Sequence, residues 1–222
     1  MPRCVLVGGA AIADYDRINR YLRPDDRFVF CDGGLHHLPR LHAVPDLIVG
    51  DFDSADRPDT AAETIVLPRE KDDTDMVYAA REAVRRGFED FLLLGAAGGR
   101  LDHTLGNLSV LLWLDDQGKT ALLADDYSDM EIVSGKEVRI GESAAFFSLL
   151  NISGTARGVE ITGAKYPLSG AEIRCDYQYG ISNEVLPGQT AAVSVREGNL
   201  LLIRVYRDPQ NSGDPPRRKE ER

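Results

Sequence analysis

The sequence predicts an α/β fold in which a parallel, Rossmann-like sheet occupies the N-terminal part and an all-β sandwich follows. Three observations support this prediction. Short apolar segments alternate with helical patterns over residues 1–125, short strands separated by glycines come next, and the composition is globular, with 43% hydrophobic and 28% charged residues. Strands that alternate with helices form βαβ units and therefore a parallel sheet. A chain of 222 residues is long enough to bury a substantial core.

Apolar segments bounded by glycine, proline or aspartate predict buried parallel strands in the first part. They are Cys4–Val7, Phe28–Cys31, Leu47–Val49, Ile65–Leu67, Phe91–Leu94 and Ala121–Ala124. Helices are predicted over Thr74–Arg86 and Leu101–Asp116. The first of these ends in basic residues followed by Gly87, which is a typical stop signal. The second carries Leu101, Leu105, Leu108 and Leu112 at spacings of four, three and four.

The pattern changes after about Asp125 to short strands and turns. Strands are predicted over Ala144–Leu149, Val159–Thr162, Ala191–Arg196 and Leu200–Tyr206, with glycines between them. We therefore expect an α/β domain at residues 1–125, a linker at 126–137 and a β-sandwich domain at 138–207. The remaining residues, 208–222, are rich in proline and charge and are expected to form a disordered tail.

The charge balance excludes some classes of partner. The 26 basic and 36 acidic residues give a net charge of −10 and a pI near 4.9, which disfavours nucleic acid because its binding depends largely on Lys and Arg. No segment approaches the roughly 18 apolar residues of a spanning helix. The apolar run Cys4–Ala13 is broken by Gly8 and Gly9, which favours a strand and turn over a signal peptide. We expect a cytoplasmic protein with no membrane partner.

Acidic residues and glycines gather where the predicted strands end. In open α/β sheets, ligands bind outside the carboxyl ends of the strands. Asp32 and Gly33 directly follow Phe28–Cys31 in the sequence Cys-Asp-Gly-Gly. Glycine lets the backbone approach a ligand closely, and the carboxylate could bind a hydroxyl or a metal. Taken alone, the Asp-Gly pair is also typical of an ordinary turn.

A second pair of acids, Asp51 and Asp53, follows the strand Leu47–Val49. If the chain stays extended there, both side chains point to the same side. Two carboxylates held so close repel each other unless a cation lies between them. Mg²⁺ prefers one or two carboxylates together with substrate phosphates. The pair therefore predicts a magnesium site, with a solvent-exposed acidic turn as the alternative.

The two loops that precede the predicted helices carry the remaining candidates. Thr74 or Asp73 is a candidate N-cap and Asp75 suits the first turn of the helix, while Lys71 is a candidate ligand for phosphate. In the loop before the second helix, glycines, a helix N-terminus and Arg100 predict an anion site, with Asp102 as a further acid. The loop matches neither the dinucleotide fingerprint nor the P-loop.

The ordered set of motifs CDGG, PDLIVGDFDS, KDDTD and GGRLDHTLGN resembles the thiamine pyrophosphokinases of the bacterial type. The resemblance continues through GAKYPL and GISNE in the second half and covers nearly the whole chain apart from the tail. Each motif alone is unspecific, but the set in this order is specific. The resemblance implies a homodimer with its active site between the subunits. It also implies Mg²⁺-dependent transfer of the diphosphate of ATP to the hydroxyl of thiamine, giving thiamine diphosphate and AMP.

The resemblance also implies roles for individual residues. The metal-binding and catalytic positions are Asp51, Asp53, Asp75 and Asp102. The ATP-binding positions are Asp32, Gly33, Lys71, Thr74, Arg100 and Asp102. Ser182 and Asn183 match the motif near thiamine, and since the second half has no tryptophan, an aromatic contact would come from a tyrosine such as Tyr166 or Tyr179. Which aspartate activates the hydroxyl stays open.

Three other functions compete with this interpretation. A diphosphotransferase for another hydroxymethyl compound, such as a dihydropterin, would differ only in its acceptor pocket. A haloacid-dehalogenase-like phosphatase would use Asp51-Phe52-Asp53 as its D-x-D motif, but Ala55 stands where that family has Thr or Val. A non-catalytic nucleotide or thiamine sensor would not need the full set of acids.

Overall fold

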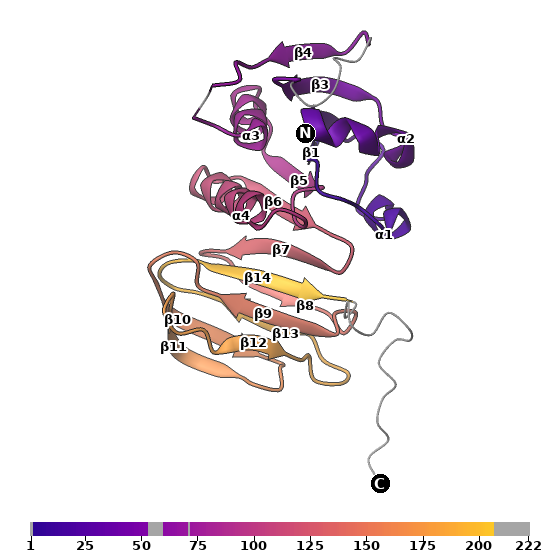
Figure 1. The fold of residues 1–222 in the computed structure, drawn as a ribbon. Helices are drawn as coiled ribbons and strands as arrows, with labels where there is room; N and C mark the ends of the chain where they lie inside the picture. The colour runs from indigo at the N-terminus through magenta and orange to yellow at the C-terminus, as the bar shows by residue number, and fades with distance from the viewer. Residues whose placement is uncertain (1, 53–59, 71, 207–222) are drawn as a thin grey trace. The chain divides into compact units, whose positions relative to one another are not determined.

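The chain forms two compact units, unit 1 (Met1–Asp126) and unit 2 (Tyr127–Arg222) (Figure 1). The computed structural model describes residues 2–52, 60–70 and 72–206. Within the expected linker at 126–137, strand β7 (Ser128–Val133) belongs to unit 2. The expected tail at 208–222 lies outside the described residues.

Unit 1 contains a parallel sheet, as the sequence predicts. Its strands are β1 (Cys4–Val7), β2 (Arg27–Cys31), β3 (Pro45–Gly50), β4 (Glu63–Val66), β5 (Asp90–Leu94) and β6 (Thr120–Ala124). They lie side by side in the order β6-β5-β1-β2-β3-β4, and each of these neighbouring pairs is parallel. The carboxyl ends of the strands consequently meet at one edge of the sheet.

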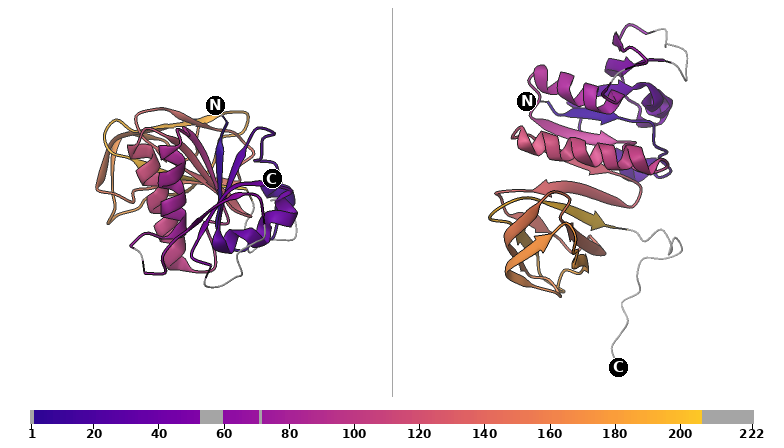
Figure 2. Two further views of the ribbon diagram at one scale, coloured as in Figure 1. Left: turned by 90° about the horizontal axis from the view of Figure 1, so that it is seen from above. Right: turned by 60° about the vertical axis from the view of Figure 1, so that its left-hand side comes forward.

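Helices cover both faces of this sheet. They are α1 (Tyr15–Asn19), the 3₁₀ helix η1 (Asp32–His37), α2 (Leu38–Leu41), α3 (Asp75–Arg85) and α4 (Leu101–Asp116). Helices α3 and α4 lie on one face and α1 and α2 on the other (Figure 2). The sequence did not predict α1, η1 and α2, because elements of four to six residues are too short for a helical period to be visible.

Helix α3 begins and ends where the sequence signals lie. The Thr74 side chain accepts a hydrogen bond of 3.3 Å from the backbone N–H of Val77, so of the two candidates it is Thr74, and not Asp73, that caps the helix. After Arg85 the chain reaches Gly87, whose φ of 91° favours glycine. Asp75, the first residue of α3, is thereby fixed at the N-terminal end of the helix.

The leucine spacing of α4 does not mark a buried face. Leu101 is 70% exposed and Leu105 is 55% exposed. The buried residues of the helix are Asn107, Val110, Leu111 and Leu114. Because apolar side chains occur all around this helix, periodicity alone could not identify the side that packs on the sheet.

Asp126, the last residue of unit 1, fixes the loop after β1. Its carboxylate accepts hydrogen bonds from the backbone N–H groups of Ala13, at 2.9 and 3.1 Å, and of Asp14, at 2.9 Å. The Asp14 side chain in turn caps α1 by accepting a bond from the N–H of Arg17. The last residue of unit 1 is therefore linked to the loop that follows its first strand.

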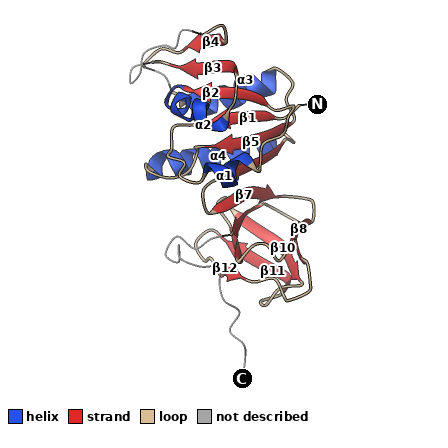
Figure 3. Cartoon of the chain, turned by 90° about the vertical axis from the view of Figure 1, so that its right-hand side faces the viewer, coloured by secondary structure: helices blue, strands red, loops and turns tan. Residues whose placement is uncertain are grey.

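Unit 2 consists of antiparallel strands around one apolar core, and every helix of the described residues belongs to unit 1 (Figure 3). Besides β7, its strands are β8 (Val138–Ile140), β9 (Phe146–Leu150), β10 (Thr155–Thr162), β11 (Leu168–Arg174), β12 (Gly180–Asn183), β13 (Ala191–Ser194) and β14 (Leu200–Val205). One layer has the order β12-β9-β14-β7 and the other β11-β10-β13-β8. Phe147, Val159 and Val193 pack in one apolar cluster that draws on both layers. Among the described residues, no helix is long and apolar enough to cross a membrane.

Candidate active site

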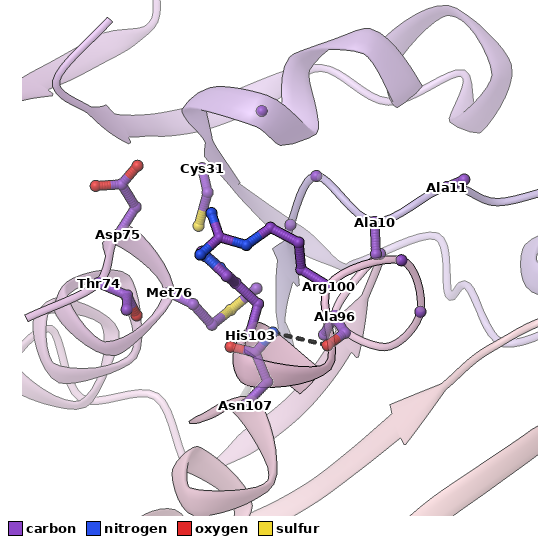
Figure 4. Close-up of a pocket in the computed structure, with 16 residues that line it drawn as sticks. Ala10, Ala11, Cys31, Thr74, Asp75, Met76, Ala96, Arg100, His103 and Asn107 are labelled. Carbon is purple, nitrogen blue, oxygen red and sulfur yellow. Dashed lines mark hydrogen bonds between the residues drawn. The ribbon is translucent and has the colours of Figure 1, made fainter. Parts of the chain in front are cut away.

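A pocket of about 420 Å³ opens at the carboxyl ends of the strands of unit 1 (Figure 4). Its lining comes from four parts of unit 1. They are residues 8–11 after β1, Cys31 at the end of β2 with Gly33 in η1, residues 74–76 at the start of α3, and residues 95, 96, 98–100, 103 and 107 after β5 and along α4. Thr74 and Asp75 lie on one side of the pocket and Ala10 and Ala11 on the other, with the Arg100 side chain between them. Of the predicted site residues, the structure therefore brings Gly33, Thr74, Asp75 and Arg100 together.

Glycines allow the loops around this pocket to pack backbone against backbone. A Cβ atom on Gly8 would lie 2.6 Å from the carbonyl oxygen of Gly95, and one on Gly34 would lie 2.1 Å from that of Val7. No side chain fits in either place. A ligand in the pocket therefore faces closely packed backbone together with the N-terminal ends of α3 and α4, an arrangement that suits an anion.

Acidic residues lie at the ends of β2 and β3 and at the start of α3. Burial, followed by the negative charge of Asp75 and, more weakly, of Asp32, raises the pKa of the Cys31 thiol, which disfavours its nucleophilic thiolate form. A Cβ on Gly50 would lie 2.5 Å from the Cβ of Asp32, so Asp32 packs directly against the end of β3. Asp51 is the next residue along that strand end.

The backbone at Phe52, the residue after Asp51, is not extended. Phe52 adopts a left-handed backbone conformation with φ of 53°, which turns the chain at this point. The extended conformation on which the prediction from the Asp51 and Asp53 spacing depends is therefore absent at Phe52. Asp53 itself and Lys71, also predicted at the site, lie outside the described residues.

Arg100 and Asp102 form an exposed bidentate pair at the start of α4. The guanidinium donates bonds of 2.6 and 3.2 Å to the two carboxylate oxygens, and chiefly this interaction lowers the pKa of Asp102 to about 2. Arg100 lines the pocket, whereas Asp102 does not. Within residues 2–52, 60–70 and 72–206, no three His, Cys, Asp or Glu side chains form a group that could hold a metal ion. Asp102 is thus held by Arg100 and not gathered with the other acids.

The predicted thiamine residues come together in unit 2. Asn183 is buried. Its side-chain oxygen accepts hydrogen bonds from the backbone N–H groups of Tyr166 and Glu184, and its side-chain nitrogen donates one to the Tyr166 carbonyl. The donor–acceptor distances are 2.8–3.0 Å. Ser182 has a φ of 57°, and its N–H donates to the Ser148 hydroxyl. Tyr166 is 57% exposed. Asn183 therefore fixes the backbone beneath an accessible tyrosine.

Sequence reasoning missed residues 8–11 and Asn107 as parts of the pocket. A signal for the first was present, since the pair Gly8-Gly9 directly follows a strand whose end must meet the ends of its parallel neighbours. Asn107 lies on α4, and its amide nitrogen donates a bond of 2.7 Å to the carbonyl of Ala96 (Figure 4). No local pattern distinguishes such an asparagine from a surface residue.

Comparison with known proteins agrees with this architecture. The family description "Thiamin pyrophosphokinase, catalytic domain" matches residues 18–123, and "Thiamin pyrophosphokinase, vitamin B1 binding domain" matches residues 137–200. The chain belongs to the thiamin pyrophosphokinase family. Its activity is that of a thiamine pyrophosphokinase, which is a diphosphotransferase.

Individual members of the family are similar over most of their length. The thiamine pyrophosphokinase of Bacillus subtilis (strain 168) is 30% identical over 169 residues, which cover 72% of this chain and 78% of that protein. Thiamin pyrophosphokinase 1 of Caenorhabditis elegans is 24% identical over 216 residues, or 91% and 88% of the two chains. The crystal structure of the B. subtilis protein has a TM-score of 0.81 at 25% identity and covers 92% of this chain and 99% of that chain. The structure from Geobacillus thermodenitrificans has a TM-score of 0.80 at 28% identity, covering 93% and 98%.

Proposed function

We propose that this enzyme takes ATP as the donor and transfers its diphosphate to the hydroxyl of thiamine, with Mg²⁺, releasing AMP. The unit 1 pocket carries this proposal, because its backbone walls, two helix N-termini and Arg100 suit a triphosphate. In this proposal unit 1 is a Rossmann-like nucleotide domain and unit 2 a β-sandwich that binds thiamine. The free cysteines Cys4, Cys31 and Cys175 fit the reducing cytoplasm as its location.

The acidic residues fit a magnesium ion that arrives with the nucleotide. Mg²⁺ takes one or two carboxylates and completes its shell with phosphate oxygens and water. Asp75 lines the pocket, Asp32 and Asp51 lie at the adjoining strand ends, and Asp53 follows them in the sequence. When bound, the ion would neutralise negative charge on the phosphates and on the leaving oxygen. In this proposal Asp102 acts by holding Arg100.

The residues of the chain would position the reaction partners and stabilise the transition state. The thiamine hydroxyl attacks the β-phosphorus, and the bond from that phosphorus to the α–β bridging oxygen breaks, so charge builds on AMP. Arg100 and the N-terminal ends of α3 and α4 are placed to stabilise that charge. One of the aspartates would accept the hydroxyl proton. Thr74 keeps the first turn of α3 in place.

Thiamine is proposed to bind at the surface formed by Tyr166 and Ser182 of unit 2. The exposed Tyr166 ring suits the cationic and aromatic rings of thiamine. Asn183, whose amide is engaged with the backbone, would position Tyr166 without touching the substrate. Tyr179 is the alternative aromatic contact, although its hydroxyl donates to the carbonyl of Glu172.

A homodimer with the active site between its subunits is supported by the outer face of α4. Leu101 and Leu105 are largely exposed, and they lie within two turns of the pocket residue Arg100. Exposed apolar side chains next to a site are typical of surfaces that a partner covers. A second copy on this face would complete the site around the acceptor.

The proposed reaction is tested by incubating the purified protein with ATP, Mg²⁺ and thiamine and identifying the nucleotide product. AMP and thiamine diphosphate in equal amounts, formed only when thiamine is present, would support the proposal. Formation of ADP, or of AMP only with a hydroxymethyl dihydropterin, would contradict it. Binding of ATP without any turnover would instead indicate a sensor.

A further inference from the structure

A buried histidine lies behind one wall of the pocket. His37 belongs to η1 and is only 1% exposed. Its Nε2 lies 2.9 Å from the carbonyl oxygen of Ala10, and its Nδ1 lies 2.5 Å from the hydroxyl oxygen of Tyr15 on α1. The Arg40 guanidinium covers the Tyr15 ring at 4.0 Å. Tyr15, His37 and Ala10 thus form a continuous chain of hydrogen bonds.

The partners define the roles of the two ring nitrogens. A backbone carbonyl can only accept, so Nε2 carries the proton and donates to Ala10. Nδ1 of the neutral ring therefore accepts the Tyr15 O–H. Burial, followed by the neighbouring His36, lowers the pKa of His37 to about 4, so the ring is neutral near pH 7.

Ala10 is the pocket residue that this chain of bonds reaches. Its carbonyl accepts the bond from His37, and its N–H donates a bond of 2.8 Å to the carbonyl of Gly95, which also lines the pocket. Ala10 and its neighbours Gly8, Gly9 and Ala11 carry side chains no larger than methyl and line the pocket directly. Such a segment has large conformational freedom unless its backbone is held.

We propose that His37, with Tyr15, is a positioning residue for the nucleotide: it fixes the Ala10 carbonyl and so preorganises the 8–11 wall of the pocket. The inference rests on the proposed use of this pocket for ATP. A wall that is ordered before binding loses less entropy when the nucleotide enters. His37 and Tyr15 therefore contribute to nucleotide affinity. The acids and Arg100 on the other loops carry the chemical step.

Two substitutions of His37 separate the two hydrogen bonds. Glutamine places an amide N–H near the position of Nε2 and can still donate to Ala10. Asparagine places its amide near Nδ1, where it can meet Tyr15 but is too short to reach Ala10. The matched control is His42→Asn, on an exposed histidine at the end of α2 with φ of 50°, a conformation that asparagine tolerates.

Binding is measured by calorimetry with Mg²⁺ and the α,β-methylene analogue of ATP, which cannot release AMP. We expect His37→Asn to weaken the analogue about three- to tenfold, His37→Gln, which loses only the Tyr15 bond, to weaken it no more than Tyr15→Phe does, and His42→Asn to stay within about twofold of the wild type. In turnover, His37→Asn should raise KM for ATP by a similar factor and leave kcat and KM for thiamine within about twofold. Tyr15→Phe, which keeps the ring packing, should weaken the analogue about two- to threefold.

A second readout follows the tautomer directly. Nitrogen NMR of the histidine rings should show His37 as the Nε2–H form, and Tyr15→Phe should shift it toward a mixture of tautomers. Equal affinity of wild type and folded His37→Asn, or equal weakening by Gln and Asn, would overturn the positioning role while leaving the ATP assignment intact. Failure of the wild type to bind the analogue would overturn both. If His37→Asn does not fold, unchanged affinity and tautomer in Tyr15→Phe would overturn the inference.

Discussion

The side-chain amide of Asn107 on α4 donates a hydrogen bond of 2.7 Å to the carbonyl of Ala96, in the loop that follows β5. Asn107 is buried, and both residues line the pocket. The bond therefore attaches the loop that carries the pocket glycines to the helix whose N-terminus lines the pocket. Without the Asn107 amide, the buried carbonyl of Ala96 would lose this hydrogen-bond donor.

Asn107→Ala should lower the free energy of unfolding by about 1–3 kcal/mol, because removing the donor leaves a buried acceptor unsatisfied. Urea unfolding of unliganded protein measures this loss. Asn199→Ala is the control, since Asn199 meets Ser153 at an exposed position and its loss should cost less than about 0.5 kcal/mol. Similar values for the two variants would contradict the role of the Asn107 bond.

Arg100→Lys should lower kcat/KM for ATP about 10- to 100-fold without lowering the urea midpoint. Lysine keeps the positive charge but loses the planar fork that meets a phosphate and Asp102 at the same time. Arg139→Lys, which alters an exposed pair with Glu137 in unit 2, should keep wild-type kinetics. Wild-type kinetics in Arg100→Lys would remove Arg100 from the phosphate site.

Asp53→Asn and Asp75→Asn should each reduce turnover at least about 100-fold and leave the fold intact, since each removes a carboxylate proposed to hold Mg²⁺. Circular dichroism checks the fold, and AMP release at a series of Mg²⁺ concentrations checks the metal. Asp116→Asn at the far end of α4 is the control. A variant with wild-type turnover and Mg²⁺ dependence would exclude its aspartate from the metal site.

His37 should make the protein less stable in acid. Its pKa is lowered to about 4 in the folded chain and lies near 6.5 in the unfolded chain, so between these values the unfolded state binds more protons. Stability then falls as the pH falls from about 6.5 to 4, with a slope of at most about 1.4 kcal/mol per pH unit from this group. His37→Gln should show a shallower acid slope in urea unfolding, and His42→Asn should not. Identical slopes in His37→Gln and the wild type would refute the assignment.

Leu105→Glu should weaken the proposed homodimer, because it places a charge in the apolar face of α4. Light scattering during size-exclusion chromatography, over a dilution series, measures the mass. Val44→Glu, at another exposed apolar position of unit 1, should leave the mass unchanged. A dimer of unchanged stability in Leu105→Glu would show that this face is not the interface.

The parallel sheet was predictable because its strands are apolar on both faces and are bounded by breakers, as β1 and β5 show. The start of α3 was predictable because a cap acts locally at Thr74. The pairing of Asp102 with Arg100 was not, since it depends on rotamers at an exposed helix start. The turn at Phe52 was not predictable either, because a non-glycine residue in the left-handed conformation has no reliable signal in the sequence.

The bonds from Asp126 to Ala13 and Asp14 determine where the chain can be cut. A recombinant fragment ending at residue 125 would lack this carboxylate and would leave two amide groups, close in sequence to the 8–11 wall of the pocket, without their acceptor. Isolation of the catalytic half for binding studies therefore requires Asp126 in the fragment, although the last strand of its sheet already ends at Ala124.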